Sequence, residues 1–200
     1  ALLWVGWFGF NAGSALAANE NAAMAMLVTH ISAAAATITW MLIDWYKNGK
    51  PGLVGMITGM VAGLATVTPA SGFIGPLGGL ILGVSSGVVC YWFVGYVKTF
   101  LNIDDSLDVF AVHGVGGILG TLLCGLLATA SFGGMGLESS VWDQTKVQII
   151  GVVSIALYTF IVTSIIVMIT QKVVGLRVTE QEENRDGLDL GSHGESSYHL

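Results

Sequence analysis

The chain has 200 residues, of which 54% are hydrophobic and only 10% are charged, and its formal net charge is −6. A soluble domain carries about 25% charged residues, so this composition excludes an ordinary soluble fold, and the chain has no basic patch of the kind that binds nucleic acid. Glycine occurs 28 times, mostly inside the apolar runs, which is typical of membrane-spanning helices.

Six apolar segments follow one another along the chain, at about residues 1–10, 22–45, 53–67, 73–97, 109–130 and 147–174. A spanning helix needs about 20 residues, so we expect the start of the first segment to lie upstream of Ala1. After Gly175 the composition becomes polar, and six of the 13 acidic residues follow Val178. The pattern predicts an all-α, polytopic transmembrane bundle over residues 1–175 and a soluble tail over residues 176–200.

Lysine and arginine give the orientation, because cytoplasmic loops carry an excess of both. Alternating spans place six of the seven positive residues on one side of the membrane, namely Lys47, Lys50, Lys98, Lys172, Arg177 and Arg185, and leave Lys146 on the other. The tail is therefore predicted to be cytoplasmic, and the loops at residues 11–21, 70–72 and 131–143 to face outward.

Glycines recur every four residues in two of the segments: Gly55, Gly59 and Gly63 in one, and Gly75, Gly79, Gly83 and Gly87 in the other. This spacing keeps them on one helix face, and small residues let helix backbones approach closely in a membrane. The two ladders predict tight helix packing and say nothing about a substrate.

His113 is the main candidate for chemistry, because an ionisable residue at membrane depth is a functional hypothesis by default. The alternative is a neutral histidine that bonds a neighbouring helix. Gly114, Gly116 and Gly117 leave space beside the ring. A neutral imidazole has one donor and one acceptor nitrogen, so it suits the passage of a small polar molecule, or a proton relay.

Acidic residues precede the His113 segment, at Asp104, Asp105 and Asp108. Their position favours helix capping, for which we single out Asp105 and Asp108, over a role with substrate.

Aromatic residues gather near the start of the chain, where Trp7 and Phe10 lie three apart and Ser14 follows. Aromatic faces attract cations and a serine oxygen accepts hydrogen bonds, although an interfacial aromatic belt gives the same pattern. His30 is expected only to bond a neighbour.

Motifs for other chemistries are absent from the sequence: it has no phosphate-binding loop, no Cys/His cluster with metal spacing and no nucleophile elbow. We therefore expect no cofactor and no metal. A membrane enzyme is disfavoured, because His113 is the one candidate acid–base residue at depth with no visible partner.

Four stretches together strongly resemble the Amt branch of the Amt/Mep/Rh ammonium transporters: GWFGFNAGSALAANENAA, ATVTPASGFIGPLGGLILG, DDSLDVFAVHGVGGILGTLLCG and VGLRVTEQEENRDGLDLGSHGESSY. Members of that family have eleven spans, built from two inverted repeats of five and a last helix. The resemblance implies that this chain holds spans six to eleven, the second inverted repeat plus the final helix, with the sixth span cut short.

The resemblance also implies roles for particular residues. His113 matches the second of twin pore histidines, Phe10 one of two stacked gate phenylalanines, and Ser14 the serine of an external ammonium recruitment site; their partners belong to the first repeat. Asp105 resembles the capping aspartate before the histidine helix. Pore-lining or pore-adjacent positions are matched by Trp7, Leu3, Val61, Thr68 and Val109.

The implied mechanism recruits ammonium outside, deprotonates it and conducts ammonia past the histidines, with methylammonium as a substrate analogue and the route of the proton left open. The resemblance further implies a multi-pass protein of the plasma membrane, a homotrimer, and a cytoplasmic tail that couples subunits and docks a PII-type signal protein. Composition alone would make that tail disordered and acidic. An ammonium sensor of the same fold and a different narrow pore, for gas or water, are the alternatives.

Overall fold

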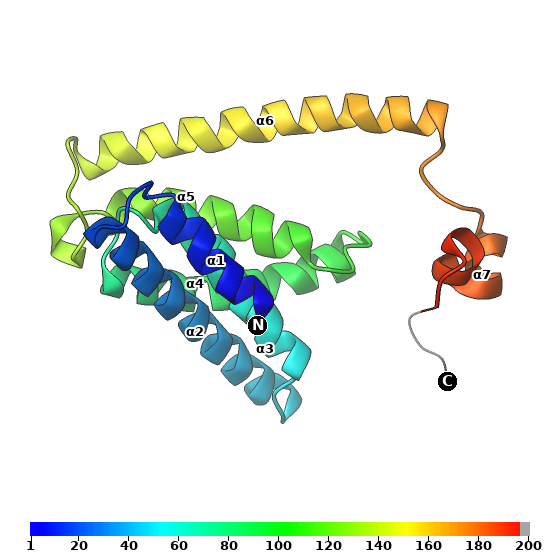
Figure 1. Cartoon of the computed structure of the whole chain (residues 1–200), viewed down its shortest axis with the longest axis horizontal. Helices are drawn as coiled ribbons and strands as arrows, with labels where there is room; N and C mark the ends of the chain where they lie inside the picture. Colours follow the sequence, from blue (N-terminus) through cyan, green and yellow to red (C-terminus); the bar gives the residue numbers. More distant parts are fainter. Residues whose placement is uncertain (197–200) are drawn as a thin grey trace. The chain divides into compact units, whose positions relative to one another are not determined.

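A computed structural model of the chain describes residues 1–196, apart from the side chains of Arg185 and Asp186. The α-helices are α1 (Leu2–Gly13), α2 (Glu20–Asn48), α3 (Leu53–Val67), α4 (Pro76–Gly95), α5 (Gly116–Leu127), α6 (Val141–Val173) and α7 (Glu180–Leu188) (Figure 1). Short 3-10 turns η1 (Thr68–Ala70) and η4 (Ala130–Phe132) and π-helical turns η2 (Tyr96–Phe100), η3 (Phe110–Val115) and η5 (Asp189–His193) complete the list. The described residues contain no strand, and the predicted all-α class is confirmed.

Five helical stretches in the described residues are long and apolar enough to cross a membrane, at Glu20–Asn48, Leu53–Ala70, Pro76–Phe100, Phe110–Leu127 and Val141–Val173. Helix α3 has the predicted bounds. Helix α6 begins six residues earlier than expected, because its first turn is polar. There the Ser140 hydroxyl accepts a hydrogen bond from the Asp143 amide at 3.1 Å, and Lys146 pairs with the Asp143 carboxylate at 3.0 Å.

The chain forms two compact units, residues 1–152 and residues 153–200. In the first unit, α2 packs against α1, α3 and α4. Both glycine ladders face α2, except that Gly75 packs against Gly133: a Cβ built on Gly63 or on Gly83 would lie 2.5 Å from the carbonyl oxygen of Ser32. The Ser32 hydroxyl also donates to the Gly63 carbonyl at 2.9 Å. Larger residues at these glycine positions would push the helices apart. The helices therefore pack as closely as the ladders predict.

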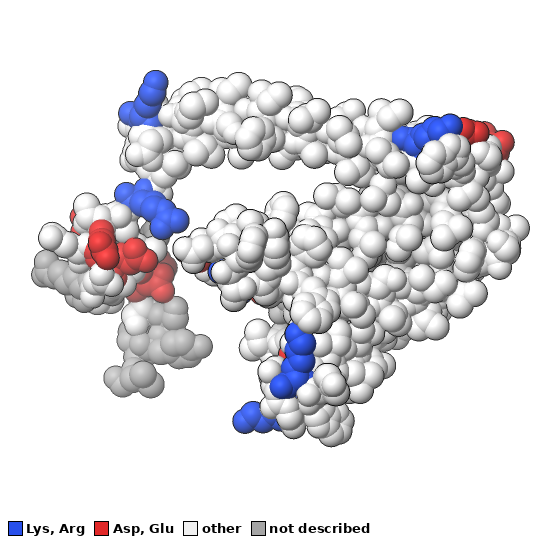
Figure 2. Space-filling model, turned by 180° about the vertical axis from the view of Figure 1, so that it is seen from behind, with Lys and Arg blue, Asp and Glu red and all other residues white. Residues whose placement is uncertain are grey.

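Charged side chains lie near the ends of the helices of this unit, and the face shown in Figure 2 is largely free of them. Lys47 near the end of α2 illustrates the arrangement. Its ammonium lies 3.8 Å from the Trp92 ring centroid and 4.9 Å from that of Tyr91, and so it joins α2 to α4 through cation–π contacts.

The second unit contains the C-terminal part of α6 and the tail helix α7. Helix α7 opens with a capping box, in which the Glu182 amide donates to the Thr179 hydroxyl and the Glu182 carboxylate accepts from the Thr179 amide. At Gly187 the backbone leaves helical geometry, with φ of 70°. The described part of the tail is thus largely helical, in contrast to what its composition favours; the division of the chain at residue 175 stays a prediction.

Candidate functional site

His113 lies in the π-helical turn η3, which leads directly into α5. Its side chain is exposed and borders a cavity of about 510 Å³ that is lined by Val97, Ile103, Asp104, Asp105, Val109, Phe110, His113 and Gly114. A π-helical turn is rare and occurs often at functional sites. Directly after the turn, Gly116 at the start of α5 packs closely against α3, where an added Cβ would lie 2.7 Å from the Thr66 hydroxyl.

Trp7 of α1 stacks on His113. The two rings are parallel to within 4°, and their centroids lie 6.2 Å apart. Phe10, one turn further along α1 and 58% exposed, contacts Trp7 edge-on with centroids 6.1 Å apart. Three of the residues predicted from sequence therefore form one continuous wall of rings.

Hydrogen bonds fix the position of α1 in this wall. The Trp7 indole donates to the Thr68 hydroxyl at 2.8 Å, and the Thr68 hydroxyl donates to the Leu64 carbonyl at 2.7 Å. Four residues beyond Trp7, the Asn11 amide donates to the Thr29 hydroxyl of α2 at 3.0 Å. Thr68 lies in η1, where Pro69 interrupts the helical hydrogen bonding that α3 began.

The other predicted pore residues flank this wall. Ser14 is exposed at the C-terminal cap of α1, and its hydroxyl donates to the Phe10 carbonyl at 2.8 Å. Val61, like Trp7, packs against the buried cluster that contains Trp40 and Val112, and Val109, 50% exposed, lines the cavity beside His113. Leu3 is exposed near the start of α1, away from these contacts.

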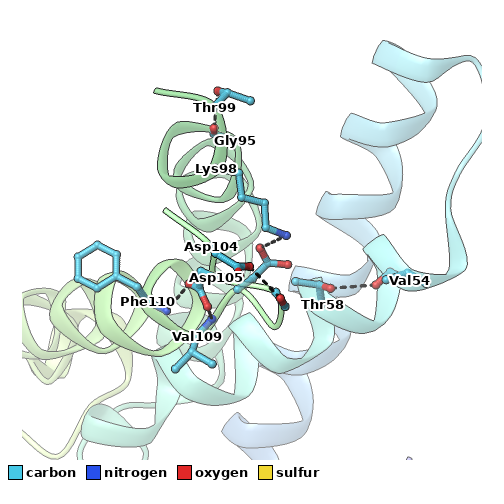
Figure 3. A network of polar contacts seen from close by, with 11 residues as sticks. Val54, Thr58, Gly95, Lys98, Thr99, Asp104, Asp105, Val109 and Phe110 are labelled. Carbon is cyan, nitrogen blue, oxygen red and sulfur yellow. Dashed lines mark hydrogen bonds and ion pairs between the residues drawn. The ribbon is translucent and has the colours of Figure 1, made fainter. Parts of the chain in front are cut away.

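An aspartate-containing loop holds the start of the His113 segment (Figure 3). The two carboxylate oxygens of Asp105 accept from the amides of Val109 and Phe110, at 2.8 and 2.9 Å, so this side chain caps the turn. Asp108 has a different role. Its backbone adopts a left-handed conformation with φ of 56°, and its carboxylate pairs with Lys98 of η2 at 2.7 Å.

Several contacts that matter here give no signal in the sequence. Lys98, Asn11 and Thr29 are fixed by tertiary contacts, which no local pattern reports. His30 differs from expectation: its ring contacts Trp4 and Phe8 at 5.2 and 5.9 Å, and it makes no hydrogen bond to another described residue. The α1 face opposite it presents aromatic rings, which offer no acceptor. Within the described residues, no group of three potential metal ligands occurs.

Comparisons with known proteins identify the family of this chain. The model of the Ammonium Transporter Family matches residues 1–198. A putative ammonium transporter of Methanothermobacter thermautotrophicus is 49% identical over all of this chain and 50% of its own length, and an ammonium transporter of Aquifex aeolicus is 46% identical over all of this chain and 47% of its own length. The chain thus spans about half the length of the curated relatives it matches.

The fold agrees as well. A solved structure named "Sensor Amt Protein" is 32% identical, with a TM-score of 0.86 over 95% of this chain and 46% of that one. This match confirms the Amt-type helix bundle and the multi-pass membrane architecture predicted from sequence, and the relatives are named as transporters rather than enzymes. The chain belongs to the Ammonium Transporter Family.

Proposed function

We propose that the intact protein transports ammonium or ammonia across the membrane and that His113 lines the path. The observation that carries this proposal is the exposed imidazole of His113, stacked parallel to Trp7 on the wall of a cavity of about 510 Å³. The names of the relatives support the substrate. Val61, Thr68, Val109 and Leu3 complete the part of the path that this chain supplies.

Recruitment is assigned to the end of α1 that carries Phe10 and Ser14. Both side chains are exposed there. Because the Ser14 hydroxyl gives its proton to the Phe10 carbonyl, its oxygen is left to act as an acceptor, which is the property an ammonium N–H requires. The Phe10 face adds cation–π attraction. Together they replace part of the hydration shell of the ion.

Conduction past His113 involves ammonia rather than the ion. A bare cation is costly in an apolar passage, and the wall at Trp7, Phe10 and His113 consists of rings, whereas Asp104 and Asp105 line the cavity at the start of the His113 segment. We therefore assign deprotonation to the step between recruitment and His113. The released proton passes to water, and a net current requires that it cross the membrane separately from ammonia. A neutral imidazole offers one donor and one acceptor nitrogen, which can hand ammonia along by hydrogen bonds.

The setting of this path is part of the proposal. The protein is placed in the plasma membrane, with residues 1–175 as the spanning region and residues 176–200 as a cytoplasmic tail, because six of the seven positive residues fall on the predicted inner side. Membrane lipid surrounds the spans. A homotrimer, and a PII-type signal protein at the tail, are the proposed protein partners.

Methylammonium uptake by cells that express the intact protein tests the function. We expect His113→Ala to abolish or strongly reduce uptake and the accompanying current. His30→Ala is the matched control, since the His30 ring lies against the rings of Trp4 and Phe8 and its loss should leave uptake near the wild-type level. Unchanged uptake and current in His113→Ala, at equal abundance in the membrane, would remove His113 from the path.

A sensor is the second candidate, favoured by the similarity to the structure named "Sensor Amt Protein". A sensor would bind ammonium and change the state of its tail while moving little of it. Current measurements in liposomes separate the two: a steady ammonium-driven current supports transport, and a tail response without current supports sensing.

A further inference from the structure

Two hydrogen bonds on one face of α1 use the same arrangement. Trp7 and Asn11 are four residues apart and therefore lie on one face of the helix. Each donates to a threonine hydroxyl, Trp7 to Thr68 and Asn11 to Thr29. Each threonine in turn donates to the carbonyl four residues before it, Thr68 to Leu64 at 2.7 Å and Thr29 to Ala25 at 2.6 Å.

The second bond decides what each threonine can do. A hydroxyl has a single proton, and in Thr68 that proton is committed to the Leu64 carbonyl. Thr68 therefore meets the Trp7 indole as an acceptor, and its hydroxyl has no proton left to offer to a molecule in the path.

The Trp7 indole is constrained in the same way. Its single N–H points at Thr68, so the surface that it presents beside His113 is the ring, parallel to the imidazole within 4°. An indole released from Thr68 would leave a half-buried N–H without a partner, which carries a free-energy penalty and would attract any acceptor nearby. Ammonia and water are such acceptors.

We propose that Thr68 is a positioning residue that sets substrate specificity through Trp7. It holds the indole parallel to His113 and removes the indole N–H from the wall, so that the imidazole is the hydrogen-bonding group on this stretch and the passage keeps a fixed width. Thr29 accepts a hydrogen bond from Asn11 in the same way, but away from the His113 ring, so its role is limited to anchoring the helix. The inference rests on the proposed transport function.

Thr68→Val, in the intact protein, tests this directly, because valine keeps the shape of threonine and removes the acceptor. We expect the ratio of ammonium rate to methylammonium rate to fall about fivefold, which is part of the discrimination that an apolar pocket makes against one extra carbon. A loosened indole no longer holds the passage at a fixed width, and the bulkier substrate is admitted. Thr68→Ser keeps the hydroxyl and should restore the ratio.

Thr29→Val is the matched control. It removes the same kind of acceptor from the same helix face, so we expect lower thermal stability with an unchanged substrate ratio. An unchanged ratio in Thr68→Val at normal abundance would overturn the inference, as would an equal shift in Thr29→Val. If the wild-type protein moves neither substrate, the proposed function fails instead.

Trp7→Phe provides a second test if the Thr68→Val protein does not reach normal abundance in the membrane. Phenylalanine retains a ring but has no N–H, so Thr68 has nothing to hold. We expect the ratio to fall in Trp7→Phe. A wild-type ratio in Trp7→Phe would overturn the inference.

Discussion

Two sets of polar residues hold the His113 wall, and they differ in charge. The threonine anchors, which are Thr29 and Thr68 with their donors Asn11 and Trp7, use neutral groups only. The aspartate loop, residues 104–108 with Lys98, uses carboxylates and an ammonium. The anchors join spans to one another, whereas the loop lies between η2 and η3, beyond the ends of the two spans that it connects.

The difference follows from the cost of burying charge. Thr29 is fully buried and Asn11 is 4% exposed. At such a site the free-energy cost of burying a neutral polar group is small once it is hydrogen-bonded, whereas a buried charge requires a close partner of opposite charge. In the loop, Asp104 and Ser106 are exposed and water shares the solvation. Breaking an anchor should therefore cost more than breaking a loop contact of the same length.

The largest effect is expected at Asn11. Asn11→Leu removes the donor and leaves the buried Thr29 oxygen with one partner fewer, which should lower the free energy of unfolding by about 2 kcal/mol. Thermal melting in detergent measures it, with Asn21→Leu, at an exposed position of α2, as control. Equal melting temperatures for Asn11→Leu and the control would contradict the claim that the buried anchors contribute more to stability than the loop contacts.

The Asp105 cap should have the next largest effect. Asp105→Ala removes the acceptor for two amides, and the loss of such a cap costs about 1 kcal/mol. Hydrogen exchange at Val109 and Phe110 should speed up, while the thermal transition moves less than in Asn11→Leu. Asp104→Ala, whose carboxylate accepts from the exposed Ser106 hydroxyl, is the control that should leave these amides protected.

The ion pair of Lys98 with Asp108 should contribute less, because the Lys98 side chain is 41% exposed, although that of Asp108 is only 16% exposed. Exposed pairs contribute about 0.5 kcal/mol and are screened by salt. Lys98→Met should melt slightly below wild type at low ionic strength, and the gap should close as salt is added. A gap that is large and independent of salt would show that this pair behaves as a buried one.

The smallest effect concerns the fully exposed cap of α7. Bonds from the Thr179 hydroxyl and amide hold the pKa of Glu182 below its ordinary value of 4.5. Because the pKa of Glu182 is lower in the folded state, the cap stabilises α7 at neutral pH. This stabilisation is lost as the pH falls through the lowered pKa of the folded state. NMR Cα shifts of residues 180–184 should move toward coil on acidification. Glu182→Gln should show no such transition, and an identical acid transition in that variant would remove the cap as its cause.

The sequence predicts some of these features and not others. The bounds of α3 follow from local signals, since Gly52 precedes the helix and Pro69 ends it. The exposure of His113 beside a cavity could also be anticipated, from the cost of an ionisable group at depth and from the glycines around it. Its contact with Trp7 could not, because no periodicity reports on a pair that is brought together by packing.

The bond from Trp7 to Thr68 shows the same limit, since it joins residues 61 apart in the chain. Asp105 and Asp108 illustrate it at short range. Both precede the same helical turn, yet one caps it and the other pairs with Lys98. The choice depends on the left-handed backbone at Asp108 and on where η2 places the lysine, and both are tertiary outcomes.

The central claim, that substrate passes through the cavity beside His113, can be tested by chemical modification. Val109→Cys places a thiol on the cavity wall, while Cys90 and Cys124 are buried and should not react with a polar thiol reagent. Ser106→Cys, exposed three residues before Val109 but outside the lining of this cavity, is the control for modification without blockage.

The measurement is methylammonium uptake before and after a charged methanethiosulfonate reagent is applied from the cytoplasmic side of vesicles that contain the intact protein. The account predicts that modified Val109→Cys loses uptake and modified Ser106→Cys keeps it. Complete modification of Val109→Cys with uptake unchanged would contradict it, because substrate would then be crossing by another route.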